Sequence, residues 1–507
     1  MLSVLIGHSY FQNFDPKQVD RGKPYPPLAT LQVAALLRRA GHQLSFFDAM
    51  LAESTREFEF QLHNVRPSLV LLYEDNYNYL SKMCLGKMRS AAGEMIASAR
   101  LAGAKVVAAG SDVSDAPEVY LRMGADVVLR GEGLASLQTL LGRLDADPHA
   151  DNARLVEDLG DASTLVGEAV VTGRPVASRG QVIALQGEGV SAHDEHEAAA
   201  AWDLVDMERY RAAWTQAHGY FSLNMAASKG CSFRCTWCAK PIWGNRYLQR
   251  SATAVAAEMV HLKRSFGPDH IWFADDIFGF RAEWVNSFAR ALQAAGGGTP
   301  FNIQTRADLV TPAMAQALGD AGCREAWIGA ESGSQRILDA MNKGTSVQEI
   351  LTARERLKAH GIRVGFFIQL GYLGEQLDDL LATRDLIEAA RPDDIGVSVS
   401  YPLPGTPFHE LVREQLGEKT NWEDSRDLAM MFQGTYDSRF YRSIRDLLHQ
   451  QVDLERLDGA DTAHRHRQAR DALRQQWDSL IASEEQYRSR GPHNAHGERA
   501  DVSTGAC

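Results

Sequence analysis

Short apolar runs alternate with amphipathic segments over residues 1–145, and this alternation predicts a parallel sheet with helices on both faces. The expected strands are Leu2–Gly7, Leu44–Asp48, Leu69–Tyr73, Lys105–Gly110 and Asp126–Leu129. The expected helices are Leu28–Ala40, Leu80–Leu101 and Ala116–Met123. Ligands of such sheets bind outside the carboxyl ends of the strands, so the loops that follow the strands are the candidate binding loops.

The alternation fades over residues 146–215, which are rich in polar and small side chains, and we interpret them as a linker with short strands such as Gln181–Leu185. Over residues 216–410 six further strand–helix steps predict a partial or complete β/α barrel. Its expected strands are Ser222–Ser228, His270–Ala274, Phe301–Thr305, Ala326–Ala330, Arg363–Leu370 and Ile395–Tyr401. Its expected helices are Ala252–Phe266, Arg281–Ala295, Pro312–Ala321, Val347–His360 and Leu377–Ala390.

The C-terminal part of the chain has a different pattern. Residues 411–483 predict a helical region, in which Leu447–Asp478 carries leucines at helical spacing with a break expected at Gly459. Residues 484–507 contain almost no apolar side chains, so we expect a disordered tail.

Composition and charge limit the class of protein. A chain of 507 residues with 45% apolar and 23% charged side chains suits two to four globular domains. The 53 basic and 65 acidic residues give a net charge of −12, which argues against a nucleic-acid partner held by phosphate contacts. No apolar stretch reaches the roughly 20 residues of a membrane span. The first ten residues lack the basic flank of a signal peptide and predict a buried strand instead.

Three of the 6 cysteines, Cys231, Cys235 and Cys238, lie within one short segment with the spacing Cys-x3-Cys-x2-Cys. Three thiolates on one loop can bind three irons of a cubane iron–sulfur cluster and leave the fourth iron open to an external ligand. Two alternatives remain at this point. A structural zinc site would need a fourth paired ligand, and His261 and His270 are not so paired. The three residues could also be ordinary buried cysteines.

The segment resembles the signature of the radical S-adenosylmethionine (SAM) superfamily, Cys-x3-Cys-x-aromatic-Cys, with Trp237 at the aromatic position. The resemblance implies a [4Fe–4S] cluster on the three cysteines, whose open iron chelates SAM. It also implies reductive cleavage of SAM to methionine and a 5′-deoxyadenosyl radical. Cofactors of this kind carry the chemistry, while the protein places them and excludes water.

Further candidate positions lie at or near the ends of the second to sixth barrel strands, and those of the second, fourth, fifth and sixth strands follow from the same resemblance. Asp275 and Asp276 would lie near the methionine amino group, and the alternative is a solvated pair of loop carboxylates. Glu331 would lie near the SAM ribose, beside a possible helix N-cap. The remaining expected SAM or substrate positions are Gln304, Arg306, Gln369, Gly371, Tyr401 and Leu403. Arg306 could equally be a buried salt-bridge partner. Leu373 stands where the family's Gly-x-Pro-Gly-Glu segment has proline.

The N-terminal loops resemble the cobalamin-binding domain that precedes many radical SAM barrels. The positions that the resemblance assigns to cobalamin are Tyr25, Pro26, Pro27, Leu28, Glu74, Asp75, Asn78, Gly110, Ser111, Gly131, Glu132 and Gly133. The Asp-x-His-x-x-Gly motif of many cobalamin domains is absent from the sequence, so cobalamin would bind without a histidine as lower axial ligand. The alternative is a domain with this fold and no cobalamin.

The expected architecture is therefore α/β: a Rossmann-like cobalamin-binding domain, a partial (β/α)6 TIM-type radical SAM barrel and a helical C-terminal region. The resemblance implies methyl transfer from methylcobalamin to an unactivated carbon of a small-molecule substrate, with an electron donor as partner, in the cytoplasm. One alternative is a cobalamin-linked cyclase, ring-contraction enzyme or oxidase without methyl transfer. Another is a non-enzymatic, cofactor-bearing sensor.

Overall fold

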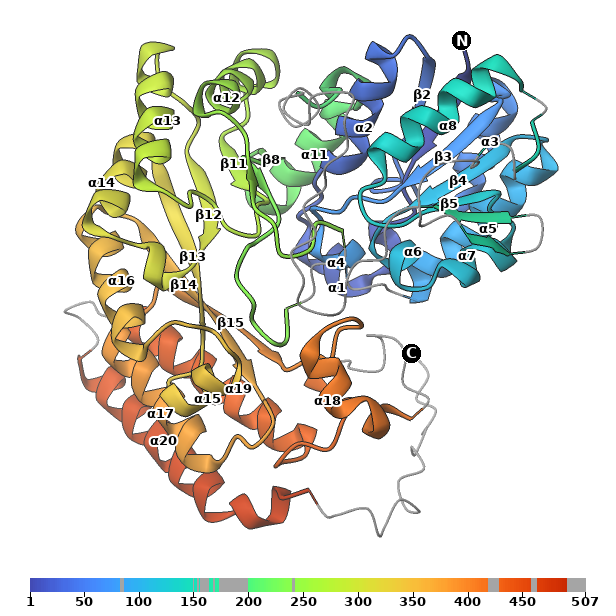
Figure 1. The fold of residues 1–507 in the computed structure, drawn as a ribbon. Helices are drawn as coiled ribbons and strands as arrows, with labels where there is room; N and C mark the ends of the chain where they lie inside the picture. The colour runs from blue at the N-terminus through green and yellow to red at the C-terminus, as the bar shows by residue number, and fades with distance from the viewer. Residues whose placement is uncertain are drawn as a thin grey trace.

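The chain folds into two α/β units that lie side by side, with helices of the C-terminal region packed on the second unit (Figure 1). The computed structural model describes residues 1–82, 86–148, 150–152, 155, 164–166, 169–172, 199–238, 242–417, 428–456 and 463–489. Among the described helices, none combines the length and the apolar character that crossing a membrane requires.

The first unit is built on a sheet with the strand order β2-β1-β3-β4-β5-β7-β6. The first five strands in chain order are β1 (Ser3–Gly7), β2 (Gln43–Phe47), β3 (Leu69–Tyr73), β4 (Lys105–Ala109) and β5 (Val127–Leu129), and they are parallel. The order 2-1-3-4-5 is that of flavodoxin-like folds. The sheet has its topological switch point between β1 and β3, where a ligand is expected at the carboxyl edge.

The last two strands of this sheet correct the linker that we expected over residues 146–215. Strand β7 (Ala169–Thr172) pairs parallel with β5, and β6 (Thr164–Val166) pairs antiparallel with β7. Residues 207–218 form the helix α11 (Met207–His218). These strands form because they pair with segments that are distant in the sequence. The local pattern of apolar and polar residues does not predict such pairing. The strand expected at Gln181–Leu185 lies outside the described residues.

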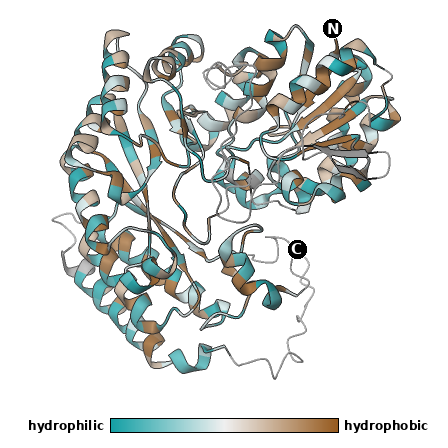
Figure 2. Cartoon of the chain, viewed as in Figure 1, coloured by the Kyte–Doolittle hydropathy of each residue, from teal (hydrophilic) through white to brown (hydrophobic). Residues whose placement is uncertain are grey.

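Side-chain alternation along the strands separates two apolar layers, and Figure 2 shows that the strands of the first unit are largely hydrophobic. Val4 and Ile6 belong to the core beneath α2 (Leu28–Arg39) and α8 (Leu134–Ala146), whereas Leu5 belongs to the opposite core. The helices of the opposite face are α3 (Thr55–Val65), α5 (Gly86–Leu101) and α7 (Pro117–Met123), and shorter segments are η1 (Gln12–Phe14), α1 (Pro16–Arg21), α4 (Tyr79–Lys82) and α6 (Ser111–Asp115). The sequence analysis did not predict α3 or α8.

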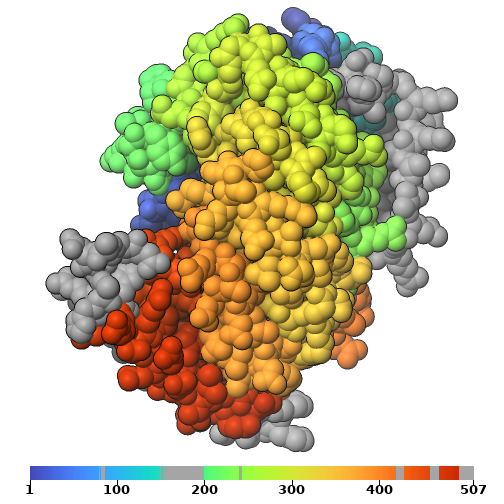
Figure 3. Space-filling model, turned by 90° about the vertical axis from the view of Figure 1, so that its left-hand side faces the viewer, coloured from blue at the N-terminus to red at the C-terminus, as the bar shows by residue number. Residues whose placement is uncertain are grey.

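The second unit is an open barrel of six parallel strands in the order β15-β14-β13-β12-β11-β8. The strands are β8 (Ser222–Met225), β11 (His270–Phe273), β12 (Phe301–Thr305), β13 (Cys323–Glu331), β14 (Arg363–Leu370) and β15 (Asp394–Val399). The helices are α12 (Ala252–Phe266), α13 (Ala282–Ala294), α14 (Pro312–Ala321), α15 (Gln335–Ala340), α16 (Val347–Ala359) and α17 (Leu377–Ala390). Figure 1 shows helices of this unit on the outer side of the strands, and Figure 3 views that face, which is covered by the yellow and orange residues. The expected fold class, with a partial (β/α)6 barrel, is confirmed.

The C-terminal region adds α18 (Pro407–Leu416), α19 (Ser438–Arg456) and α20 (Ala463–Ala482). Helix α19 packs against β15 and α17, and α20 packs against α19. The tail expected to be disordered from residue 484 is ordered at its start, because Glu484–Tyr487 forms a 3-10 helix, η5. The Tyr436 hydroxyl donates to Glu484, and the rings of Phe440 and Tyr487 lie 5.3 Å apart. Residues 490–507 lie outside the described part of the chain.

Candidate active site

The three clustered cysteines lie on the loop that follows the first barrel strand, β8, between the two units (Figure 1). The base of this loop is closed by antiparallel pairing of β9 (Ser228–Lys229) with β10 (Leu248–Gln249). Cys231 is buried, Cys235 and Cys238 are half-buried, and all three thiols are free of disulfides. The loop therefore presents three thiols from one short segment at the end of a barrel strand.

The loop is held by Thr236 and Trp237. Thr236 donates its backbone N–H to the Met341 carbonyl at 2.9 Å, and its hydroxyl lies 2.7 Å from the Tyr372 hydroxyl. The Phe408 N–H donates to the Thr236 carbonyl at 3.0 Å. Trp237 packs against the apolar cluster that contains Tyr372 and Phe408. The aromatic residue of the cysteine motif thus anchors the loop to the last strands of the barrel.

The thiols fit an iron–sulfur cluster by their chemistry. Three thiolates are the soft ligands that iron in a cubane cluster takes, and three of them occupy three of its four irons. Within the described ranges, no three His, Cys, Asp or Glu side chains are gathered closely enough to hold one metal ion. Three thiols from one short loop fit the cluster by the number and type of their donor atoms.

Arg306 follows β12 and turns toward the cysteine loop. Its Nη1 lies 3.8 Å from the Cys235 Sγ, and its guanidinium carbon lies 3.7 Å from the centre of the Phe233 ring. Its Nε lies 2.9 Å from the Asp308 carboxylate. Of the two roles that the sequence left open, the structure shows the buried salt bridge and adds a contact with a cysteine. Gln304, on the same strand, is half-buried.

Asp275 and Asp276, after β11, have different environments. Asp276 is exposed, whereas Asp275 is buried and accepts the Ala227 N–H at 3.0 and 3.2 Å and the Ser228 hydroxyl. Burial raises the pKa of Asp275 to about 7, although the hydrogen bonds from Ser228 and Ala227 oppose this shift. Asp275 therefore holds the turn that leads into the cysteine loop, and Asp276 faces solvent.

Glu331, at the end of β13, forms a buried ion pair that the sequence analysis did not predict. Its Oε1 lies 2.7 Å from the Lys343 Nζ, and the two side chains are 5% and 6% exposed. Burial alone would lower the pKa of Lys343, but the charges of Glu331 and Cys235 hold it above its usual value. Glu331 adopts φ +62°, a left-handed conformation that is rare outside glycine and clusters at functional sites.

The barrel strands send polar side chains to the side opposite the apolar core. In β14, Phe366 and Ile368 belong to the core, so Gln369 points to the other face. Three buried oxygens accept no hydrogen bond from the described part of the chain: the Asn224 Oδ1, the Gln369 Oε1 and the Ser400 Oγ. Unsatisfied buried polar atoms are costly, so these atoms are candidates for contacts with a polar ligand.

Gly371 begins the segment after β14, with φ +75°. A Cβ there would lie 2.9 Å from the Met430 Cε, so the C-terminal region covers this segment closely. The Gly371 N–H donates to the Glu375 carboxylate at 2.6 Å, and burial raises the pKa of Glu375 to about 8. Tyr401 and Leu403 follow β15 and pack against the apolar cluster that also holds Trp237.

The switch point of the first unit carries buried polar groups. Glu74 is buried after β3, and both of its oxygens accept the Ser9 N–H at 3.1 Å. Asp75 accepts the Ala29 N–H at 3.0 Å, while the Asn76 Oδ1 is buried with no hydrogen-bond partner among the described residues. Asn76 is therefore a further candidate for contact with a ligand at this edge, and the sequence analysis did not predict it.

The neighbouring loops of this edge are shaped by small residues. Gly110 has φ +150°, and a Cβ there would lie 2.7 Å from the Glu74 Cβ, so a side chain has no room. Ser111 is buried, and its hydroxyl has no partner within the described ranges. Asn78 is half-buried and accepts the Leu80 N–H at 3.0 Å.

Two pairs of side chains join the cysteine loop to this edge. The Glu132 carboxylate, between Gly131 and Gly133 after β5, forms an ion pair with Lys229, two residues before Cys231. The ring of Tyr77 lies 5.2 Å from that of Trp243. The carboxyl edge of the sheet and the cysteine loop therefore share one interface.

The expected segment Tyr25–Leu28 lies at the same interface. The Tyr25 hydroxyl is 3.1 Å from the Ser222 Oγ, and the Pro26 carbonyl accepts the Asn224 amide at 3.0 Å. Leu28 is buried in the core beneath α2, and Pro27 precedes that helix as its N-cap. This segment therefore contacts both units, through Tyr25 and Pro26 on the barrel side and Leu28 in the first unit.

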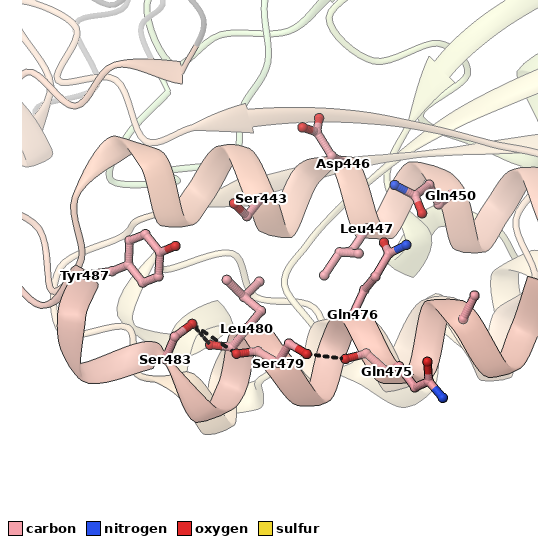
Figure 4. Close-up of a pocket in the computed structure, with 11 residues that line it drawn as sticks. Ser443, Asp446, Leu447, Gln450, Gln475, Gln476, Ser479, Leu480, Ser483 and Tyr487 are labelled. Carbon is pink, nitrogen blue, oxygen red and sulfur yellow. Dashed lines mark hydrogen bonds between the residues drawn. The ribbon is translucent and has the colours of Figure 1, made fainter.

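A separate depression of about 660 Å³ lies between α19 and α20 (Figure 4). It is lined by polar side chains such as Gln475 and Gln476, and none of the expected site residues lines it. It is therefore not part of the candidate site.

Comparison with known proteins identifies the second unit. Residues 225–387 match the family model of the radical SAM superfamily. The chain contains a radical SAM domain. This domain spans the cysteine loop, Asp275, Arg306, Glu331 and Gln369.

Relatives of known name extend the similarity beyond the radical SAM domain. An uncharacterized methyltransferase of Pyrococcus horikoshii is 25% identical over 62% of this chain and 65% of its own length, just under two thirds. The hopanoid C-3 methylase of Methylococcus capsulatus is 24% identical over 77% of this chain and 69% of its own length. The radical SAM methyltransferase TsrM of Kitasatospora setae, whose structure holds cobalamin and a [4Fe–4S] cluster, superposes with a TM-score of 0.61. It is 18% identical over 83% of this chain and 76% of its own, so it shares the fold of both units.

Proposed function

We propose that this protein is a cobalamin-dependent radical SAM enzyme that transfers a methyl group to an unactivated carbon of a small molecule. The observation that carries the proposal is the shared interface: the cysteine loop of the radical SAM domain meets the carboxyl edge of a flavodoxin-like sheet, bridged by Lys229 and Glu132. A methyl carrier and a radical source must both reach one substrate carbon, and two cofactor sites that face each other meet that demand.

The proposal assigns a role to each group of residues. Cys231, Cys235 and Cys238 would hold three irons of the cluster, and Trp237 and its apolar neighbours seat their loop. When bound, the reduced cluster and SAM supply a 5′-deoxyadenosyl radical, and cobalamin carries the methyl group. The unsatisfied buried oxygens of Asn224, Gln369 and Ser400 offer hydrogen-bond acceptors to SAM.

At the opposite side of the interface, Gly110 lets its loop pack closely on Glu74, and the corrin would lie against the loops that contain Gly110 and Gly131. Glu74 and Asp75 are engaged with backbone N–H groups, so they order the loop, and the free Asn76 Oδ1 is available to a ligand. The Asp-x-His-x-x-Gly motif is absent, so we propose that no histidine from such a motif coordinates cobalt.

The names of the relatives support methyl transfer to carbon. The hopanoid C-3 methylase and TsrM are both described as methylating enzymes. We further propose that a low-potential electron donor serves the cluster and that the protein acts in the reducing cytoplasm, because a cluster on cysteines of which two are half-buried needs protection from oxidation.

The test is anaerobic reconstitution with iron, sulfide, cobalamin, reductant and SAM that carries a trideuterated methyl group. Candidate substrates are supplied, and products are followed by mass spectrometry. We expect both 5′-deoxyadenosine and S-adenosylhomocysteine as products. The mass of the methylated substrate should increase by about 17 Da, because a CD3 group replaces a hydrogen atom. Deoxyadenosine without S-adenosylhomocysteine would instead indicate a cyclase or an oxidase and refute methyl transfer.

A matched pair of variants tests the cluster itself. The triple variant C231A/C235A/C238A should bind no iron and cleave no SAM. Cys323 is buried and lies outside the loop, so C323A should keep the iron content of the wild type. Retention of stoichiometric iron by the triple variant would show that the cluster is held elsewhere.

A further inference from the structure

Arg306 is buried, and its guanidinium is held by contacts with Asp308, Lys343 and Thr345. It is 4% exposed, and its Nε and Nη2 lie 2.9 and 3.2 Å from the Asp308 carboxylate. Its Nη2 also donates to the Lys343 carbonyl at 2.6 Å and to the Thr345 hydroxyl at 2.9 Å. These bonds fix the plane of the guanidinium. They use its Nε and Nη2 groups, so its Nη1 group takes no part in them.

The Nη1 group is directed at the cysteine loop. It lies 3.8 Å from the Cys235 Sγ, within reach of an N–H···S hydrogen bond. The guanidinium carbon lies 3.7 Å from the centre of the Phe233 ring, which is two residues before Cys235. A cation over an aromatic face is attractive, and Arg stacks in this way more readily than Lys. One side chain thus touches the loop at both an aromatic ring and a sulfur atom.

We infer that Arg306 is a positioning residue of the cysteine loop that donates an N–H group to the Cys235 thiolate and makes the bound cluster easier to reduce. The inference rests on the proposed function, since it needs a cluster on the three cysteines. Reduction adds one electron from an external low-potential donor and increases the negative charge on the cluster and its thiolates. A fixed N–H donor and a positive charge stabilise that reduced state, and hydrogen bonds to sulfur are known determinants of cluster potential.

This role differs from a direct contact with SAM or substrate. The bonds to Asp308, Lys343 and Thr345 occupy the Nε and Nη2 groups, so SAM would have to displace them. The two roles predict different measurements. A residue that tunes the cluster changes its potential before SAM is added, whereas a residue that binds SAM changes only the affinity for SAM.

The experiment compares Arg306→Gln and Arg306→Lys with wild type, after reconstitution of the full chain without SAM or cobalamin. Iron and sulfide are counted, and the potential is determined by dithionite titration with redox mediators, followed by electron paramagnetic resonance. Arg354 provides the matched control, because it is also 4% exposed and bonds a carbonyl and a carboxylate, those of Arg391 and Asp393. R354Q and R354K measure the general cost of changing a buried arginine.

We expect R306Q to retain its iron and to show about a tenfold lower ratio of reduced to oxidised cluster at a fixed potential. For a one-electron couple this corresponds to a midpoint about 59 mV more negative. R306K keeps the charge without the planar fork, so its shift should be smaller and of the same sign. The Arg354 variants should titrate as wild type does. If R306Q does not retain iron, R306K and R354K carry the comparison.

A wild-type midpoint in iron-loaded Arg306 variants would overturn the inference. If those variants also bind SAM more weakly, Arg306 is a SAM-binding residue instead. A wild-type protein that assembles no cluster would contradict the proposed function instead, so the two failures are distinguishable by the iron content of the wild type.

Discussion

The buried ion pair of Lys343 with Glu331 makes a quantitative prediction about stability. The two charges lie 2.7 Å apart with side chains 6% and 5% exposed. At an effective dielectric constant of 20 their gross attraction is about 6 kcal/mol, and desolvation of both groups offsets much of it. Lys343→Met leaves the Glu331 carboxylate buried without its partner, and removal of one member of such a pair costs about 3–5 kcal/mol.

The double variant K343M/E331Q should cost far less than the sum of the single variants, because it removes both charges. We expect a coupling of about 3 kcal/mol in this double-mutant cycle, which exceeds the range of about 0.2–1 kcal/mol for exposed pairs. The assay is urea unfolding of the apo protein at pH 7, followed by tryptophan fluorescence. Trp327, stacked on Phe367 in β13 and β14, reports on the same part of the barrel.

The control is Arg384→Met, which breaks a pair with Asp385 whose side chains are 27% and 60% exposed. Its cost should stay below about 1 kcal/mol. The reasoning is refuted if K343M costs no more than R384M, or if the effects of K343M and E331Q simply add.

Three further predictions concern pH, the interface and one glycine. The pKa values of Asp275 and Glu375 are raised by burial from 3.8 and 4.5 to about 7 and 8, so the contribution of these two groups to the stability of the apo protein should be greatest near pH 4 and fall as pH rises to about 8. Each group contributes at most about 1.4 kcal/mol per pH unit, and D275N and E375Q should flatten the slope in urea midpoints measured across this range. Lys229→Met removes the ion pair with Glu132, and faster deuterium exchange at residues 131–133 should follow, with unchanged exchange there as the contrary result. Gly371→Ala should cost about 1–3 kcal/mol in thermal unfolding, because φ is +75°, and the added Cβ would also displace the end of the Met430 side chain, which would lie 2.9 Å away.

The sequence by itself predicted the elements whose pattern is local. Strands β3 and β14 have the bounds that their largely apolar runs predict, and β12 has the bounds that its alternation of apolar and polar residues predicts. The cysteine spacing was readable for the same reason, since all three thiols and Trp237 lie on one short loop. The resemblance to the radical SAM superfamily rested on these adjacent residues.

Tertiary structure decided which distant residues meet. Lys229 and Glu132 are 97 positions apart, and Arg306 and Cys235 are 71 apart, so no window of sequence contains either pair. The contacts of Asp275 and Arg306 with the loop after β8 could not be predicted for this reason, because their partners lie far away in the sequence. Strand β7 belongs to the first sheet because it pairs with the edge of β5. Hydrophobic periodicity is a property of one segment, whereas hydrogen bonds and ion pairs between segments depend on the path of the whole chain.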